Sequence, residues 1–388
     1  MEIDRYPQTS FGRGRRTPGR HGYVAYFPAK IPRRLDLPAV TVALLAETES
    51  ALGQLAAVGR LVPNPDLLIR PYLLREAVSS TRIEGTQATI GEVLDSDATG
   101  AGPSADVEEV VNYVAGMREG LRGLDRLPLS TRLLCEMHRL LMAGARGREL
   151  APGELRTTQN WIGPGGSTIE SAPFVPPPPA ELPELLSDWE RFAHEELEMP
   201  LLVQNALLHA QFETIHPFLD GNGRLGRLML VFFLAARSRL PAPLLYLSAY
   251  LDENRDAYYA SLQAIREKGD AIPWVDLCLK SIQTQSTDAV QRAQRIIALR
   301  ERYREAASAL GTANAFDLVD LICENPVLTT RSIENRLAVS RPTALRLLRR
   351  MEEQGVLTEA EEGARRQRRY VARELLDAVA GKGGLDGL

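Results

Sequence analysis

The segment 216–227 reads His-Pro-Phe-Leu-Asp-Gly-Asn-Gly-Arg-Leu-Gly-Arg and combines several groups that phosphate chemistry uses. His216 titrates near neutrality and can take a proton from an attacking hydroxyl. Asp220 is a short, hard anion suited to hold a Mg²⁺ that arrives with phosphates. Arg224 and Arg227 are three positions apart, so on a helix they share a face. These residue types predict a site for phosphoryl or nucleotidyl transfer.

The backbone of the same segment is suited to an anion. Gly221, Asn222 and Gly223 precede an apolar run, 225–234, that reads as a helix. Glycines let backbone N–H groups approach an anion closely, and the amino end of a helix carries a partial positive charge. We therefore expect a polyphosphate at the amino end of the helix that begins after Leu219.

At this point the chain resembles the Fic family, whose motif His-x-Phe-x-Asp/Glu-Gly-Asn-Gly-Arg-x-x-Arg is matched here at every defined position. The resemblance implies an all-helical fold that binds ATP as its Mg²⁺ complex, with Mn²⁺ as an alternative metal. It also implies transfer of AMP to a Ser, Thr or Tyr hydroxyl of a protein, including the enzyme itself. Such an enzyme is a protein adenylyltransferase, or AMPylase.

The resemblance also assigns a role to each residue of the motif. His216 would deprotonate the target hydroxyl, and Asp220 would ligate Mg²⁺ between the α- and β-phosphates. Arg224 would contact the β-phosphate side and Arg227 the γ-phosphate. The backbone amides that would hold the phosphates belong to Gly221, Asn222 and Gly223.

A second short motif lies upstream. Residues 80–85 read Ser-Thr-Arg-Ile-Glu-Gly, and they match the family's inhibitory motif at Ser80, Glu84 and Gly85. The resemblance implies that Glu84 pairs with Arg227 and occupies the place of the γ-phosphate, because arginine binds carboxylate and phosphate with the same planar fork. The alternatives are that these residues belong to an ordinary amphipathic helix, or that Glu84 orients a water for removal of AMP.

Composition is that of an ordinary globular protein. The chain has 388 residues, of which 44% are hydrophobic and 25% charged, and its formal net charge is −4. No run of eighteen apolar residues occurs, and the first twenty residues lack the apolar centre of a signal peptide. Three separated cysteines fit reduced core thiols rather than a disulfide framework. We therefore expect a cytoplasmic protein without a membrane span.

The hydrophobic pattern predicts an all-α architecture in several parts. We expect a mobile tail over 1–30, an N-terminal helical region with the inhibitory helix over 31–106, and a Fic core over 107–285. A linker helix over 286–312 and a winged helix-turn-helix domain over 313–388 would follow. The individual segments expected to be helical are 40–59, 67–84, 107–124, 182–196, 200–212, 245–262 and 290–310, with a loop over 95–104.

Three further parts of the core carry weaker predictions. Residues 156–179 break the helical period and read as a small β-hairpin, which resembles the flap that Fic proteins use to align a target segment by strand addition. An ordinary surface loop is the alternative. Ile162 and Ile169 are the residues expected to touch a target. Gln211 and Asn254 are expected to reach the nucleotide, whereas His209 lies on an apolar helix and reads as a packed core histidine.

The C-terminal region has a different design. Helices are expected over 316–325, 330–337 and 340–354, followed by strands at 355–357 and 370–371 around a basic loop, an order that resembles a winged helix-turn-helix domain. Ser340 would cap the third helix. Eight arginines could meet phosphates: Arg341, Arg346, Arg349, Arg350, Arg365, Arg366, Arg368 and Arg369. Neighbouring glutamates dilute this charge, so docking of a protein remains the alternative to DNA.

Three readings of function follow from these patterns. The first is an AMPylase inhibited by its own Glu84, with a homodimer compatible with the resemblance. The second is a DNA-binding regulator whose core only senses nucleotide. The third keeps the enzyme but changes the donor, since relatives of this fold transfer UMP, phosphocholine or phosphate. The base His216 and the carboxylate of Asp220 favour an enzyme over a sensor.

Overall fold

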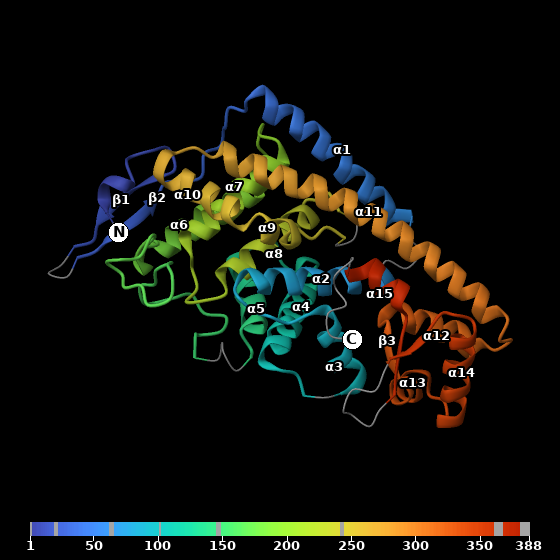
Figure 1. Cartoon of the computed structure of the whole chain (residues 1–388). Helices are drawn as coiled ribbons and strands as arrows, with labels where there is room; N and C mark the ends of the chain where they lie inside the picture. Colours follow the sequence, from blue (N-terminus) through green and yellow to red (C-terminus); the bar gives the residue numbers. More distant parts are fainter. Residues whose placement is uncertain are drawn as a thin grey trace.

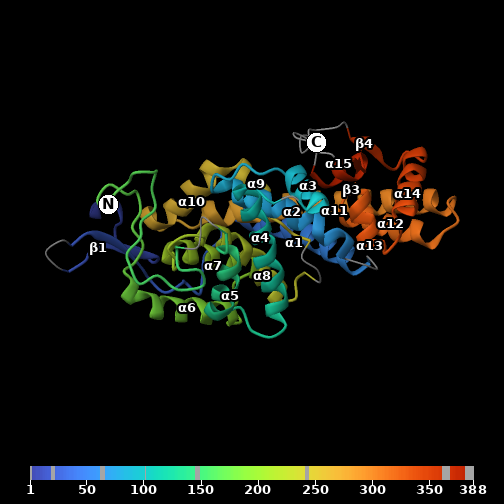
Figure 2. The same ribbon diagram turned by 90° about the horizontal axis from the view of Figure 1, so that it is seen from below.

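The computed structural model describes residues 2–18, 22–61, 66–100, 102–144, 149–240, 244–360 and 368–380. Helices dominate, and two small antiparallel sheets accompany them at opposite ends of the molecule (Figure 1). The predicted fold class, an all-α core with a C-terminal winged helix, is confirmed. Seen from below, the N-terminal strands and the C-terminal helices again lie at opposite ends (Figure 2).

The centre of the core is α7 (Leu201–Ile215), which has fourteen buried residues out of fifteen. α6 (Leu182–His194) and α8 (Asn222–Ala236) pack against it. α4 (Ala105–Leu124) and α5 (Thr131–Leu141) pack against α8, and a short 3₁₀ turn, η2 (Pro179–Glu181), contacts α6. Two indole groups donate hydrogen bonds to carbonyls of α7: Trp189 to Leu208 at 3.0 Å and Trp274 to Ala206 at 2.7 Å. Such bonds satisfy the polar atom of a buried tryptophan and fix the helix in place. The end of α7 is therefore a rigid support for the loop that connects it to α8.

The N-terminal helices pack along a second, longer helix. α1 (Ala39–Leu61) lies side by side with α11 (Ile272–Ser308), and Thr41 Oγ1 donates to Asp276 at 2.7 Å (Figure 1). α11 has 37 residues, so the helix expected as a linker is continuous with the core. α2 (Asp66–Ile83) carries the inhibitory motif at its carboxyl end and contacts α4 and α9 (Ser248–Glu253).

The loop expected over 95–104 is wrong in its first half, because residues 90–99 form the helix α3 (Ile90–Thr99). Thr89 and Glu92 form a capping box, in which the Thr89 hydroxyl accepts from the Glu92 amide and the Glu92 carboxylate accepts from the Thr89 amide. The helix ends at Gly100, which has φ 66°. In the structure, the helix-starting signal Thr-x-x-Glu therefore decides the conformation of this segment, although its polar composition suggested a loop.

The single helix expected over 245–262 is also divided. α9 (Ser248–Glu253) and α10 (Arg255–Lys268) meet at Asn254, which has φ −116° and ψ 34°. The Asn254 side chain donates to the Tyr250 carbonyl at 2.9 Å, and the same carbonyl accepts from the Asn254 amide at 3.1 Å. Asn254 therefore has a structural contact at the break.

The expected mobile tail over 1–30 is instead a folded hairpin. After a 3₁₀ turn, η1 (Ile3–Arg5), the strands β1 (Gly12–Arg16) and β2 (Val24–Pro28) pair antiparallel. Tyr6 and Tyr26 pack edge to face with ring centroids 5.6 Å apart, and both contact Phe174. The arginines that suggested a solvated tail lie mostly on the exposed side of β1, so they do not prevent burial of the aromatic face.

The expected flap is smaller than predicted. Within residues 156–179, Ile162 and Phe174 form one antiparallel bridge, and no strand of two or more residues occurs there. The backbone of this segment finds a further partner in the N-terminal hairpin, because the Tyr26 amide donates to the Val175 carbonyl at 2.9 Å. The short flap thus forms a backbone hydrogen bond to β2 and has no strand ladder of its own.

The C-terminal domain confirms the winged helix prediction with small shifts. Its elements are α12 (Ala313–Glu324), β3 (Val327–Thr329), α13 (Thr330–Leu337), α14 (Arg341–Glu353), β4 (Thr358–Ala360), β5 (Arg369–Val371) and α15 (Arg373–Ala380), with sheet order β3-β5-β4. The strand expected at 355–357 lies at 358–360. Ser340 is at the N-cap of α14, but its hydroxyl contacts Thr343 Oγ1 and makes no capping bond to the backbone. Arg365 and Arg366 lie outside the described residues.

This domain makes polar contacts with α3 and packs against α2. Arg369 pairs with Asp95 of α3 at 2.9 Å, and Asn325 Nδ2 donates to Asp97 at 3.1 Å. Thr329 Oγ1 donates to the Ala98 carbonyl at 3.2 Å, and α12 and α15 both contact α2. The winged helix therefore lies against the helix that carries the inhibitory motif and against α3, the next helix along the chain.

His209 confirms the prediction of a packed core histidine and makes stability sensitive to acid. The buried ring stacks on Trp274 and lies between the Gly226 carbonyl and the Tyr258 hydroxyl, and burial lowers the pKa of His209 to about 3. The unfolded chain binds this proton near the ordinary pKa of about 6.5, so the stabilisation is complete above that pH and is lost as pH falls below it.

We expect His209→Gln to flatten the acid side of the stability profile. Each such histidine adds a slope of about 1.4 kcal/mol per pH unit below pH ~6.5. Urea unfolding of the wild type and the variant between about pH 4.5 and 7.5 measures this slope. The same slope in both proteins would contradict this account of His209.

Candidate active site

His216 lies where α7 ends, and its backbone is clamped there. It is the C-cap residue of α7 and has a left-handed conformation, φ 49° and ψ 60°, which is uncommon for a residue other than glycine. The side chain of Arg156 holds this turn by donating to the carbonyls of His216 at 2.9 Å, Ile215 at 3.3 Å and Pro177 at 2.5 Å. Burial lowers the pKa of Arg156 to about 10.

The imidazole of His216 is neutral at physiological pH. Burial, together with the nearby charges of Arg156 and Arg266, lowers the pKa of His216 to about 3. The ring keeps 17% of its surface exposed. A neutral imidazole with an accessible edge can accept a proton, which is the chemistry the sequence predicted for it.

The loop after His216 is held by side chains that bond its backbone. Asn222 accepts from the Phe218 amide and donates to the Phe218 carbonyl, both at 2.9 Å. His138 Nδ1 accepts from the Gly153 amide at 2.8 Å, so His138 is protonated on Nε2 and donates from it to the Asp220 carbonyl at 2.9 Å. Burial lowers the pKa of His138 to about 4 and keeps the ring neutral.

Two glycines shape the start of α8. Gly221 is the N-cap, with φ 75°, and a Cβ there would also lie 2.9 Å from Met142 Sδ. A Cβ at Gly223 would lie only 2.4 Å from Glu84 Oε1. Gly223 therefore lets the carboxylate of Glu84 reach the amino end of α8, where backbone N–H groups lack helical partners and favour an anion.

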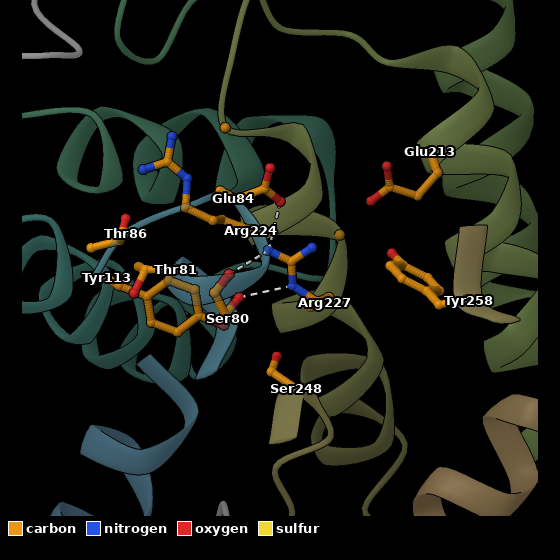
Figure 3. A network of polar contacts seen from close by, with 12 residues as sticks. Ser80, Thr81, Glu84, Thr86, Tyr113, Glu213, Arg224, Arg227, Ser248 and Tyr258 are labelled. Atoms are coloured by element: carbon orange, nitrogen blue, oxygen red, sulfur yellow. Dashed lines mark hydrogen bonds and ion pairs between the residues drawn. The ribbon is translucent and has the colours of Figure 1, made fainter. Parts of the chain in front are cut away.

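The predicted contact between Glu84 and Arg227 is present (Figure 3). Arg227 Nη2 donates to Glu84 Oε1 at 2.8 Å and to the Ser80 carbonyl at 2.8 Å, and Arg227 Nε donates to Ser80 Oγ at 2.9 Å. Gly85 follows with φ 102°, a conformation that favours glycine. All three predicted residues of the inhibitory motif thus lie together at the end of α2.

This ion pair is electrostatically strong because one member is fully buried. Arg227 is 1% exposed, while the side chain of Glu84 is 37% exposed. Burial alone would raise the pKa of Glu84, but the charge and hydrogen bond of Arg227 hold that pKa below its ordinary value. Burial would likewise lower the pKa of Arg227, and the charge of Glu84 raises it instead. Both groups are therefore ionised at neutral pH.

Arg224 and Asp220 lie beside a cavity of about 260 Å³. Arg224 Nη2 is 3.3 Å from Asp220 Oδ2, and its buried Nε has no hydrogen-bond partner among the described residues. Asp220 is half exposed and accepts from the Gly221 amide at 2.6 Å. The cavity wall also includes Glu84 and Glu109.

A Mg²⁺ site of the expected kind is compatible with Asp220. The described residues contain no group of three His, Cys, Asp or Glu side chains that could hold a metal by themselves. Mg²⁺ commonly uses only one or two protein carboxylates and completes its shell with phosphate oxygens and water. An exposed carboxylate at the amino end of α8 fits that pattern.

Four residues predicted to touch the nucleotide or a target have contacts within the chain. Gln211 Nε2 donates to the Ala29 carbonyl at 3.0 Å and so ties α7 to the N-terminal segment, while Asn254 bonds within its own turn. Ile162 and Ile169 are partly buried against two small clusters of the hairpin, which reduces the side-chain surface that a target could contact. Trp161 beside them is 43% exposed.

Comparison with known proteins identifies the family of this site. Residues 42–122 match the family description "Fic/DOC family N-terminal", and residues 128–234 match "Fic/DOC family". The chain therefore carries a Fic domain preceded by a Fic N-terminal region. Residues 312–358 match "Winged helix-turn-helix DNA-binding", in agreement with the C-terminal fold.

Similar proteins bear on both sequence and fold. The chain is 31% identical over 222 residues to a protein named protein adenylyltransferase fic-1 from Caenorhabditis briggsae, covering 54% of this chain and 39% of that protein. It is 29% identical over 206 residues to protein adenylyltransferase Fic from Drosophila grimshawi, covering 50% and 38%. The chain thus spans about two fifths of the length of these relatives.

Among solved structures, a Fic family protein from Desulfovibrio desulfuricans has the same fold. Its TM-score is 0.57 at 24% identity, with 87% of this chain and 97% of that chain covered. In the part of this chain that the structure describes, no helix combines the length and the apolar character needed to cross a membrane.

The Arg156 clamp predicts a loss of stability. We expect Arg156→Met to lower the free energy of unfolding by about 2–4 kcal/mol, because several buried carbonyls would lose their donor. Thermal and urea unfolding measure the change. Arg132→Met, at an exposed arginine of α5, is the control and should stay within about 0.5 kcal/mol of the wild type. An unfolding free energy of Arg156→Met as close as that to the wild type would show that the clamp contributes little.

Proposed function

We propose that this Fic protein transfers AMP from Mg²⁺-bound ATP to a Ser, Thr or Tyr hydroxyl of a protein, itself included. The observation that carries the proposal is a neutral imidazole, His216, placed one short loop before the amino end of α8, where Arg227 contributes a buried positive charge. The names of the relatives, protein adenylyltransferases, agree with it.

The proposed step is an in-line displacement at the α-phosphorus. His216 accepts the proton of the target hydroxyl while its oxygen bonds to that phosphorus, and the bond to the pyrophosphate oxygen breaks. The N–H groups of Gly221, Asn222 and Gly223 and the guanidinium groups of Arg224 and Arg227 neutralise the phosphates. Asp220 would hold Mg²⁺, which supplies charge neutralisation between the phosphates when bound.

The Glu84 contact supports autoinhibition. A carboxylate on Arg227 uses the same guanidinium donors that a terminal phosphate would use. Because Glu84 Oε1 also lies at the amino end of α8 near Gly223, it competes for charge and for space. Bound ATP would then lack the phosphate orientation that in-line attack requires. Removal of AMP with Glu84 as a water-orienting group, and donors other than ATP, remain alternative reactions of the same site.

We expect Glu84→Gly to raise auto-AMPylation by about tenfold or more, because the competing anion is gone and Arg227 is free for phosphate. Glu84→Gln, which keeps the shape but loses the charge, should give an intermediate rise. Incubation with ATP labelled on the α-phosphate, followed by gel analysis, measures the transfer.

The control is His216→Ala in the Glu84→Gly protein, which should bind ATP normally but show no transfer. Labelled UTP, GTP and CTP in parallel reactions test the donor. Transfer by Glu84→Gly at or below the wild-type level would refute the inhibitory role of Glu84. Undiminished transfer without His216 would refute the enzymatic mechanism.

DNA binding is the second candidate function, and the surface of α14 favours it. Arg341, Arg346, Arg349 and Arg350 are all exposed. Among the described residues no ion pair is recorded for these four, whereas Arg368 and Arg369 of the wing pair with Glu359 and Asp95. The charge available to DNA phosphates is therefore on the helix more than on the described part of the wing.

A mobility-shift titration with a random DNA duplex tests this surface. We expect binding that weakens steeply with salt, and Arg346→Ala with Arg349→Ala should reduce the slope of log K against log salt by about 2. The matched control is Arg60→Ala with Arg118→Ala, two exposed arginines outside the winged helix. Equal losses in both double variants, or no shift at low salt, would favour a protein-docking role.

A further inference from the structure

Two buried polar atoms beside the proposed catalytic base have no hydrogen-bond partner among the residues that the structure describes. They are Nδ1 of His216 and Oε1 of Glu213, the residue one helical turn before it on α7. The separation between His216 Nδ1 and the other carboxylate oxygen, Oε2, is 4.0 Å. The backbone carbonyl of Glu213 also acts on the ring and favours its protonated form, but it makes no hydrogen bond of standard geometry to Nδ1. Buried polar groups are nearly always satisfied, so the two side-chain atoms still call for an explanation.

The backbone at His216 is held in place, so the imidazole ring is the part of the residue that can change its position. Arg156 bonds the carbonyl groups of Ile215 and His216, and α7 is buried along its length. The ring retains 17% exposure although its Nδ1 atom is buried, so the accessible surface belongs to its other atoms. A modest rotation of either side chain would shorten 4.0 Å to a hydrogen bond of about 2.8 Å.

Ionisable groups from four helices surround Glu213. From α8 comes Arg227, and from α10 come Tyr258 and Arg266, whose Nε donates to Thr214 Oγ1 at 3.1 Å. From α2, Glu84 adds a negative charge, and His209 lies one turn earlier on α7 itself. Figure 3 shows Glu213 and Tyr258 on the side of Arg227 that faces away from Ser80.

Space for this carboxyl group depends on Gly226, which occupies an undefined position of the motif. A Cβ at Gly226 would lie 2.2 Å from Glu213 Oε1 and 3.3 Å from the His209 ring. Burial raises the pKa of Glu213 to about 7, against the opposing influence of Arg227. The group therefore changes charge in the neutral range, next to an imidazole that stays neutral there.

We propose that Glu213 is the positioning residue of the catalytic base: its carboxylate accepts a hydrogen bond from His216 Nδ1–H and so leaves Nε2 free to take the proton of the target hydroxyl. This inference rests on the proposed transferase function. An imidazole has one proton and two nitrogens when neutral, and a carboxylate on one nitrogen decides which of them can act as base.

Each proton that moves in this step has a donor and an acceptor. The target O–H proton moves to Nε2 as the oxygen bonds to the α-phosphorus and pyrophosphate leaves. His216 then carries two protons and a positive charge, which the Glu213 carboxylate stabilises through Nδ1–H. Loss of the Nε2 proton to water restores the neutral ring.

The test compares variants in the Glu84→Gly protein, where transfer is not inhibited. Glu213→Gln keeps an acceptor but loses the charge, and Glu213→Ala loses both. The control, Asp188→Asn, alters a buried carboxylate of α6 that pairs with Arg33 and lies outside the motif. Single-turnover transfer is measured at saturating Mg²⁺-ATP between about pH 5.5 and 8.5.

In the parent we expect the rate to rise with pH as Glu213 ionises, because ionised Glu213 is the active form. The midpoint should lie below the pKa of about 7 that Glu213 has in the unmutated chain, since the charge of Glu84 raises that pKa and is absent from the parent. Glu213→Gln should be slower by about tenfold to a hundredfold and lose this rise, and Glu213→Ala should be slower still. The affinity for ATP should change by less than about twofold in Glu213→Gln and in Glu213→Ala, since the side chain at position 213 does not contact phosphate. Asp188→Asn should keep the parental pH profile.

Nitrogen-15 spectra of the histidine rings provide a readout independent of transfer. With the His216 signal assigned through His216→Ala, we expect the Nδ1–H tautomer in the parent and a mixture of tautomers in Glu213→Ala. An Nε2–H tautomer in the parent, or a parental rate and pH profile in Glu213→Gln, would overturn the proposal. Absence of any transfer in the Glu84→Gly parent would instead refute the proposed function, while the tautomer would still test the Glu213 contact.

Discussion

A buried arginine must have an anion, and in this protein Arg227 has Glu84. The guanidinium group is 1% exposed and bonded to Ser80 on one side, and the carboxylate of Glu84, 2.8 Å away, compensates its charge. Removing one member of a buried pair leaves an uncompensated charge. Under the proposed function, a phosphate would take the place of this carboxylate on Arg227.

The loop keeps that shape because neighbouring side chains satisfy its backbone. Arg156 bonds the carbonyls around His216, Asn222 bonds both polar groups of Phe218, and His138 bonds the Asp220 carbonyl. None of these contacts needs a ligand, so the base and the helix terminus are held in position beforehand. Such preorganisation is where the rate enhancement of phosphoryl transfer mainly originates.

The sequence predicted the parts whose chemistry is local. The motif loop, the pairing of Glu84 with Arg227 and the winged helix could be read from residue types and spacing. Arg156 and His138 could not, because their partners are backbone carbonyls about sixty and eighty positions away, and backbone acceptors leave no mark in a sequence. The N-terminal hairpin was missed for a related reason. Its aromatic residues are buried by contact with Phe174, which is far away in the sequence, and the arginines of β1 make the segment read as polar. The capping box of α3, by contrast, could be read from the sequence, but the prediction of a loop followed the polar composition instead.

The central claim is that Glu84 holds the place of a nucleotide phosphate on Arg227. Its most direct test is a crystal structure of the Glu84→Gly protein soaked with Mg²⁺ and a non-hydrolysable ATP analogue. The account predicts a phosphate oxygen within hydrogen-bond distance of Arg227 Nη2, at the position that Glu84 Oε1 occupies in the unmutated chain. Well-defined phosphates that lie elsewhere, with no oxygen in contact with Arg227, would contradict it.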